Sequence, residues 1–184
     1  MVTSTSSMTG ECDRYAAALR RGRTLSIGYV ASPPLDPVRE ATQAQYAMRQ
    51  LSALVDAAAA HHFTVTVIPY ARPELLRSAR VDAVYAPDAR ESDPLLAIAA
   101  AQSIPVITND LPLPPDAGMW IRTGYEDAAT AALDLLAASG ATNIGLLTGE
   151  PGLPRLEIGE SVYQQWCASR GQAPIVARVD AASL

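Results

Sequence analysis

The chain has 184 residues, of which 49% are hydrophobic and 18% charged, a balance that is typical of a folded protein and excludes a disordered one. This length suits one large domain or two small lobes. The formal net charge of −5 argues against nucleic-acid binding by the domain as a whole. No apolar run is long enough to cross a bilayer, and Cys12 and Cys167 are too far apart in sequence to indicate a metal site or a disulfide framework. We therefore expect a cytoplasmic protein that binds no membrane, metal or cofactor.

The N-terminal residues fall into two segments. Residues 1–11 are rich in serine and threonine, and we expect them to be disordered. Residues 13–21 contain good helix formers between Asp13, a capping residue, and Gly22, a residue that commonly ends helices, so they predict a short helix. This end of the chain is locally basic, because the helix and the residues after it contain Arg14, Arg20, Arg21 and Arg23.

The remainder of the chain alternates between two kinds of pattern. Short apolar runs predict strands at residues 25–31, 64–68, 81–86, 104–108, 119–123, 143–148 and 174–179. Helical patterns between them predict helices at residues 39–60, 73–79, 92–102, 126–139 and 157–170. Strands separated by helices favour right-handed βαβ units, and strands that are apolar throughout are covered by helices on both faces. The sequence therefore predicts a doubly wound α/β fold with a parallel sheet.

A binding site is expected at one edge of this sheet, because ligands bind beyond the carboxyl ends of parallel strands. The loops that follow the strands contain most of the prolines, and they are residues 32–38, 69–72, 86–91, 109–117 and 149–156.

Patterns for catalysis are weak. His61 and His62 are adjacent, so on a helix they point in different directions and make a poor metal pair. No phosphate-binding glycine motif follows the first strand, which argues against a nucleotide-using enzyme. One predicted helix carries three residues that we interpret as packing residues rather than a nucleophile with its neighbours: Tyr163, Trp166 and Cys167. We expect no enzymatic activity.

Several short motifs follow one another along the chain. They are Thr24-Leu25-Ser26-Ile27-Gly28, Asp36-Pro37, Val81-Asp82-Ala83-Val84, Ser103-Ile104-Pro105-Val106-Ile107 ending in Asp110, Leu135-Leu136-Ala137-Ala138-Ser139-Gly140, and Asn143-Ile144-Gly145-Leu146-Leu147-Thr148-Gly149. This ordered series resembles the lactose-repressor (LacI/GalR) family of transcriptional regulators. The resemblance implies a periplasmic-binding-protein-like type I fold, with a first lobe at residues 24–123 and an incomplete second lobe at residues 124–184. It also implies that the chain lacks the helix-turn-helix head and the C-terminal part of such regulators.

The basic N-terminal segment is similar to the hinge helix of this family. Asp13-Arg14-Tyr15-Ala16-Ala17-Ala18-Leu19, followed by Arg20-Arg21-Gly22-Arg23, makes residues 12–23 hinge-like. The resemblance implies DNA contacts by Arg14, Ala16, Leu19 and Arg20, with Leu19 as a wedge in the minor groove. An ordinary helix lying on the domain explains the segment equally well. DNA is expected as a partner only if a helix-turn-helix head is present in the intact protein.

The resemblance also implies effector contacts, which we assign to Asp36, Asp110 and Arg155. An ionised aspartate accepts two hydroxyl hydrogen bonds, which suits a polyol. Each aspartate has a second interpretation, since Asp110 could cap the proline-rich turn after it and Asp36-Pro37 is a turn signal. Two expected polar positions carry Gly124 and Gly159 instead, and Arg155 stands about one helical turn before the second of them. The ligand is therefore altered or lost.

The sequence thus predicts the ligand-sensing domain of a LacI-type regulator, which binds a sugar or related metabolite between two lobes. A homodimer would form through the apolar side of helix 39–60, which includes Met48, unless that side is simply core. Two alternatives remain open: a solute-binding protein of a transport system, and a decayed regulator fragment that binds no ligand.

Overall fold

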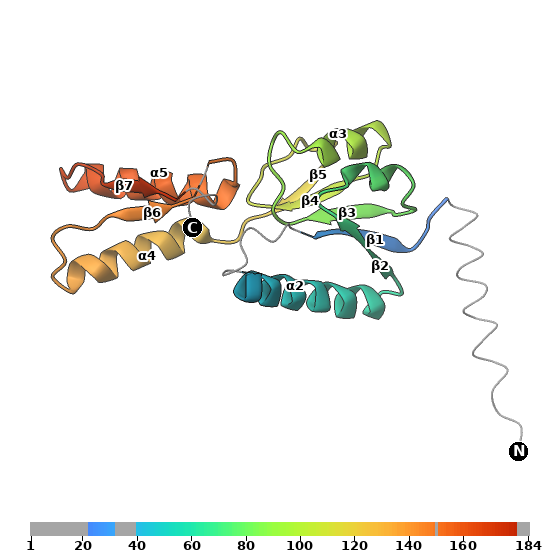
Figure 1. Ribbon diagram of the computed structural model, residues 1–184, viewed down its shortest axis with the longest axis horizontal. Helices are drawn as coiled ribbons and strands as arrows, with labels where there is room; N and C mark the ends of the chain where they lie inside the picture. The colour runs from blue at the N-terminus through green and yellow to red at the C-terminus, as the bar shows by residue number, and fades with distance from the viewer. Residues whose placement is uncertain (1–21, 32–39, 150, 180–184) are drawn as a thin grey trace, which may run out of the picture.

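The computed structural model describes residues 22–31, 40–149 and 151–179 (Figure 1). The predicted disordered segment 1–11 and the predicted helix 13–21 lie outside the described residues. The described elements form a larger unit, from β1 to β5 with α2, η1 and α3, and a smaller unit, from α4 to β7.

The larger unit is built on a parallel sheet. Its strands are β1 (Ser26–Ala31), β2 (Thr64–Pro69), β3 (Ala83–Ala86), β4 (Val106–Asn109) and β5 (Gly118–Ile121), in the order β2-β1-β3-β4-β5. Each lies on a predicted apolar run, which confirms the parallel sheet. Gly118 permits the last pairing, because a Cβ there would come within 1.8 Å of the Val106 carbonyl oxygen.

Helices cover both faces of this sheet, as the sequence predicts for a doubly wound fold. Figure 1 shows α2 (Glu40–Ala60) against one face and α3 (Pro94–Ala101) against the other. The predicted short helix at 73–79 is a 3-10 helix, η1 (Pro73–Arg77), on the same side as α3. The apolar core lies between the sheet and this second layer, and its most deeply buried members are Ile68, Leu76, Val84, Leu95 and Ala99.

The contact between α2 and the sheet is partly polar. The Tyr29 hydroxyl donates to Gln50 Oε1 over 3.2 Å, and Gln50 Nε2 donates to the Tyr85 hydroxyl over 2.9 Å. That hydroxyl donates in turn to Asn109 Oδ1 over 3.1 Å. Burial raises the pKa of both tyrosines, so the hydroxyls stay protonated at neutral pH and remain donors. This chain, the Tyr29–Asn109 network, joins α2 to three strands.

The predicted apolar side of α2 is buried at only one end. Ala58 is 4% exposed, whereas Met48 is 62% and Val55 44% exposed. The interpretation that this whole side is core is therefore wrong. Gln50, which is not part of the predicted apolar side, faces the sheet instead.

The smaller unit contains α4 (Tyr125–Ala138), β6 (Leu146–Thr148), α5 (Pro154–Ser169) and β7 (Val176–Arg178), with β6 and β7 parallel. Tyr163, Trp166 and Cys167 form its core, which confirms their predicted packing role. The Tyr163 hydroxyl donates to the Ile144 carbonyl and accepts from the Ile175 amide, both over 2.8 Å, which fixes α5 to the segments just before both strands.

The start of β1 depends on Asp82. Leu25 has a φ of 53°, a left-handed conformation that is unusual for leucine. The Asp82 carboxylate accepts hydrogen bonds from the Thr24 amide, the Thr24 hydroxyl and the Leu25 amide, at 2.7, 2.9 and 2.9 Å. Burial opposes ionisation of Asp82, but these hydrogen bonds and the charge of Arg23 outweigh it and lower its pKa.

We predict that Asp82→Asn lowers the free energy of unfolding by about 1–3 kcal/mol at pH 7, because an amide cannot accept all three bonds. A lowered folded-state pKa stabilises above the unfolded-state pKa, and this contribution disappears as pH falls through the folded-state pKa. The difference between variant and wild type, measured by urea denaturation, should therefore shrink towards pH 3. Asp56→Asn, on the exposed side of α2, is the control. A pH-independent difference would contradict the prediction.

Candidate functional site

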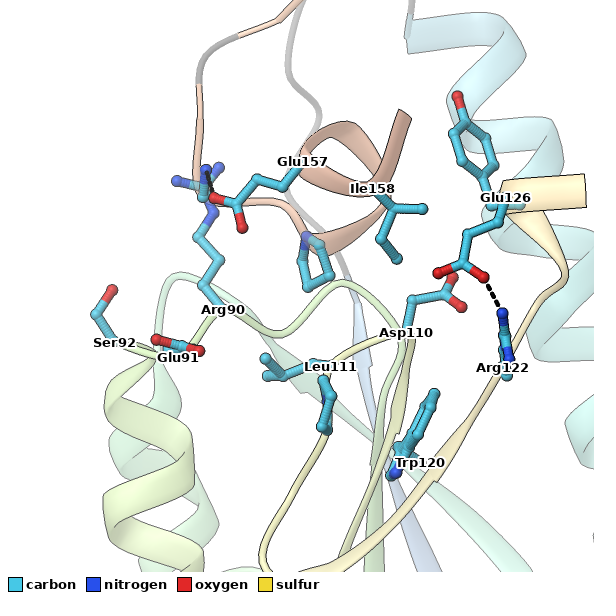
Figure 2. A pocket seen from close by; sticks show the side chains of 14 residues that line it. Arg90, Glu91, Ser92, Asp110, Leu111, Trp120, Arg122, Glu126, Glu157 and Ile158 are labelled. Carbon is cyan, nitrogen blue, oxygen red and sulfur yellow. Dashed lines mark hydrogen bonds and ion pairs between the residues drawn. The ribbon is translucent and has the colours of Figure 1, made fainter. Parts of the chain in front are cut away.

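A cavity lies between the two units, at the carboxyl ends of β4 and β5 (Figure 2). Its volume is about 630 Å³, which is within the usual range for small-molecule sites. The larger unit contributes Arg90, Glu91, Ser92, Asp110, Leu111, Pro112 and Trp120. The linking segment and the smaller unit contribute Arg122, Tyr125, Glu126, Gly152, Pro154, Glu157 and Ile158. The cavity thus lies at the edge of the sheet where the sequence predicts a site.

Asp110 lines this cavity and also holds the link between the units. Its φ is 55° and it is 7% exposed. Its carboxylate accepts hydrogen bonds from the Thr123 amide over 2.8 Å and the Thr123 hydroxyl over 2.5 Å. Both carboxylate oxygens of Asp110 bond to Thr123, so the interpretation of Asp110 as a cap for the turn after it is wrong. Within that turn, the Leu111 carbonyl accepts a hydrogen bond from the Thr108 hydroxyl.

Arg155 lies beside the cavity rather than in its wall. It is in the first turn of α5, and its guanidinium forms an ion pair with Asp88, which follows β3. This pair joins the smaller unit to the larger one. The other predicted site residues, Asp36 and the hinge-like Arg14, Ala16, Leu19 and Arg20, lie outside the described residues.

The two unexpected glycines are linked through a tyrosine that sequence reasoning did not assign to the site. Gly124 has a φ of 73° and precedes the first residue of α4, Tyr125. A Cβ at Gly159 would come 3.0 Å from Cε1 of Tyr125. The Tyr125 ring therefore occupies the space beside α5 that a side chain at position 159 would need. The only sequence signal was the replacement of both expected polar residues by glycine.

Charged side chains from both units surround the cavity. Arg122, just before α4, forms an ion pair with Glu126, four residues further along the chain, as Figure 2 shows. Glu157 Oε1 accepts a hydrogen bond from the Gly152 amide over 3.0 Å. The side chain of Arg90 extends towards the same turn, with Nη1 3.5 Å from where a Cβ on Gly152 would lie. Sequence reasoning identified the loops that carry Arg90 and Gly152 but not these side chains.

Neither a metal centre nor a membrane span is found among the described residues. No group of three or more His, Cys, Asp or Glu side chains there is arranged to hold a metal ion. Among the same residues, no helix combines the length and the apolar character needed to cross a membrane.

Solved structures show the class of protein that shares this architecture. The transcriptional regulator CelR in complex with cellobiose matches with a TM-score of 0.72 and 15% identity, covering 97% of this chain and 58% of that chain. Cra from Pseudomonas putida, in complex with fructose 1-phosphate, matches with a TM-score of 0.66 and 19% identity, covering 86% and 58%. A periplasmic binding protein/LacI regulator from Alkaliphilus metalliredigens with D-xylulofuranose has a TM-score of 0.63 and 14% identity, covering 85% and 57%.

The fold is therefore of the periplasmic-binding-protein-like type I class. Within that class, it is the fold of the effector-binding domains of LacI-type regulators, as the sequence resemblance implies. The chain spans 57–61% of the length of the solved chains. No protein-family model matches the sequence, and comparison with curated proteins gives no match.

We predict that the effect of Gly159→Ala depends on Tyr125. Replacing a helical glycine by alanine stabilises a helix by roughly 0.5–1 kcal/mol when there is room for the methyl group. In a Tyr125→Ala background this gain should appear in urea denaturation. With Tyr125 present the gain should be smaller, because the ring must shift. Equal gains in the two backgrounds would show that Tyr125 does not need a glycine at position 159.

Proposed function

We propose that this chain is the effector-sensing part of a LacI-type transcriptional regulator, acting in the cytoplasm. The observation that carries the proposal is the cavity between the two units, at the carboxyl ends of β4 and β5. Three solved structures with the same fold are of regulators in complex with cellobiose, D-xylulofuranose and fructose 1-phosphate. We infer that a small polar metabolite, of the sugar class or related to it, binds in this cavity with Asp110 as one contact.

Both units would contact the ligand, so binding would favour one arrangement of the units over another. The Asp110–Thr123 hydrogen bonds fix the segment that links them, and the Asp88–Arg155 ion pair joins them on a second side. A ligand shifts such an equilibrium only as far as its affinity differs between the two arrangements. We therefore assign Arg155 a role in holding the units together.

Control of DNA binding is the proposed output. In this scheme Arg14, Ala16, Leu19 and Arg20 belong to a hinge that contacts DNA in the intact regulator, and Asp36 belongs to the effector site. Each Lys or Arg that neutralises a phosphate makes binding dependent on salt. If a helix-turn-helix head is present in the intact protein, operator binding should depend on the effector: it should fall either on adding the effector or on removing it.

The effector site can be tested by screening sugars, polyols and purines for an increase in the melting temperature of the chain. We expect at least one compound to raise it, and Trp120→Ala to weaken that compound's binding by about fivefold or more, since a stacked aromatic ring commonly contributes over 1 kcal/mol. Trp120 is 43% exposed, so its removal should leave the fold intact. Met119→Ala is the matched control, because Met119 lies on the same strand and is not among the residues that line the cavity. If no compound binds, the proposal is overturned.

The dimer can be tested on α2. Met48 and Val55 are large apolar side chains exposed on this helix, and a buried interface would remove them from water. We expect the wild-type chain to sediment as a dimer and Met48→Glu as a monomer in analytical ultracentrifugation. Ala53→Glu, also exposed but on another side of α2, should leave the dimer intact. A wild-type monomer, or a dimer that tolerates Met48→Glu, would remove this interface.

A further inference from the structure

The cavity carries more negative than positive charge. Its lining includes two arginines, Arg90 and Arg122, and four carboxylates, Glu91, Asp110, Glu126 and Glu157. The formal charge of the lining is therefore −2. Asp110 is buried, whereas Glu91 and Glu157 are exposed and the Glu126 side chain is 44% exposed, so water and salt partly screen this charge and its effect is largest at low salt. A ligand with a negative charge would be repelled here, and a neutral ligand would leave the excess charge uncompensated.

Hydrogen-bond acceptors also outnumber donors in the lining. Each ionised carboxylate has about four lone-pair sites. Asp110 and Glu157 use some of theirs within the protein, on Thr123 and Gly152. The Arg122 guanidinium is already paired with Glu126. Figure 2 shows the side chains of Asp110 and Glu126 among those that line the cavity. A ligand rich in N–H donors would satisfy the acceptors that remain.

Two aromatic rings border the same cavity and are partly open to solvent. Trp120 is 43% and Tyr125 40% exposed. The face of an aromatic ring attracts cations. The smaller unit already contains this combination, since the Arg170 guanidinium lies 3.9 Å from the centre of the Trp166 ring and bonds to Asp134 over 2.9 Å. A cation held between an indole and a carboxylate is thus an arrangement that this chain forms within itself.

We propose that the ligand of this cavity is a cation that carries a protonated amine, such as an amino sugar or a small polyamine. The inference rests on the proposed effector site and specifies its ligand class. It separates this chain from a regulator that binds a sugar phosphate, because the same carboxylates that hold an ammonium group repel a phosphate.

Matched probes that differ in charge test the proposal. Binding of glucosamine, glucose, glucose 6-phosphate, putrescine and 1,4-butanediol to the chain is measured by calorimetry at pH 6 and low salt. We expect at least one of the two amines to bind more tightly than its hydroxyl analogue, and its affinity to fall with added salt. If neither amine binds more tightly than its analogue, the cationic ligand is overturned. Binding of glucose or glucose 6-phosphate in that case would still support the proposed effector site, so the two failures are distinguishable.

Variants that remove one charge locate the effect. Glu157→Gln removes the charge but keeps a carbonyl oxygen for the Gly152 amide. Glu91→Gln also removes one charge, and the Glu91 carboxylate has no hydrogen bond to another described residue that the substitution could break. Each should weaken binding of the amine by roughly fivefold to tenfold, as expected for one partly screened charge pair, and should weaken binding of a neutral probe less. Glu74→Gln, exposed on η1 and outside the cavity lining, is the control and should change nothing. Equal binding of the amine by all three variants and the wild type would overturn the proposal.

Discussion

Because all five strands of the larger sheet run parallel, their carboxyl ends and the loops that follow them meet at one edge. The loop after β3 brings Asp88 and Arg90 to this edge, the end of β4 brings Asp110, and β5 leads directly into the segment that carries Arg122. The smaller unit starts from the same place, so its first helix and the start of α5 face those loops. One backbone direction therefore decides both where the cavity forms and which segments can line it.

Sequence patterns predicted the elements well and the site in part, for different physical reasons. Apolar runs and helical spacing report burial directly, and all seven strands appear where those runs lie. The parallel arrangement then predicts the edge that carries Asp110. Side-chain pairing depends instead on distances across the fold, which spacing along the chain does not contain. Arg155 therefore has an ion-pair partner 67 positions away that no local pattern indicates.

Gly124 and Gly159 also show that side-chain packing across the fold is not predicted from the sequence. Absence of an expected polar residue at positions 124 and 159 was visible in the sequence, but its consequence was not. Only the packing of Tyr125 against α5 shows that the space at Gly159 is filled rather than empty. At these two positions the structure has no polar side chain, and the Tyr125 ring borders the cavity beside them.

The Tyr29–Asn109 network has a consequence for how α2 is placed. In the described part of this helix Leu51 and Leu54 are half-buried, and Ala58 is the residue buried most deeply. Apolar contacts of this kind have no preferred direction, so by themselves they fix the register of the helix weakly. Gln50 opposes sliding, because a shift of one turn would leave its amide and the Tyr29 hydroxyl without these partners, whereas the Tyr85 hydroxyl would keep its bond to Asn109. The helix is thus held in one register by directional bonds, so the position of its outer surface, with Met48 and Val55, is set from the side that faces the sheet.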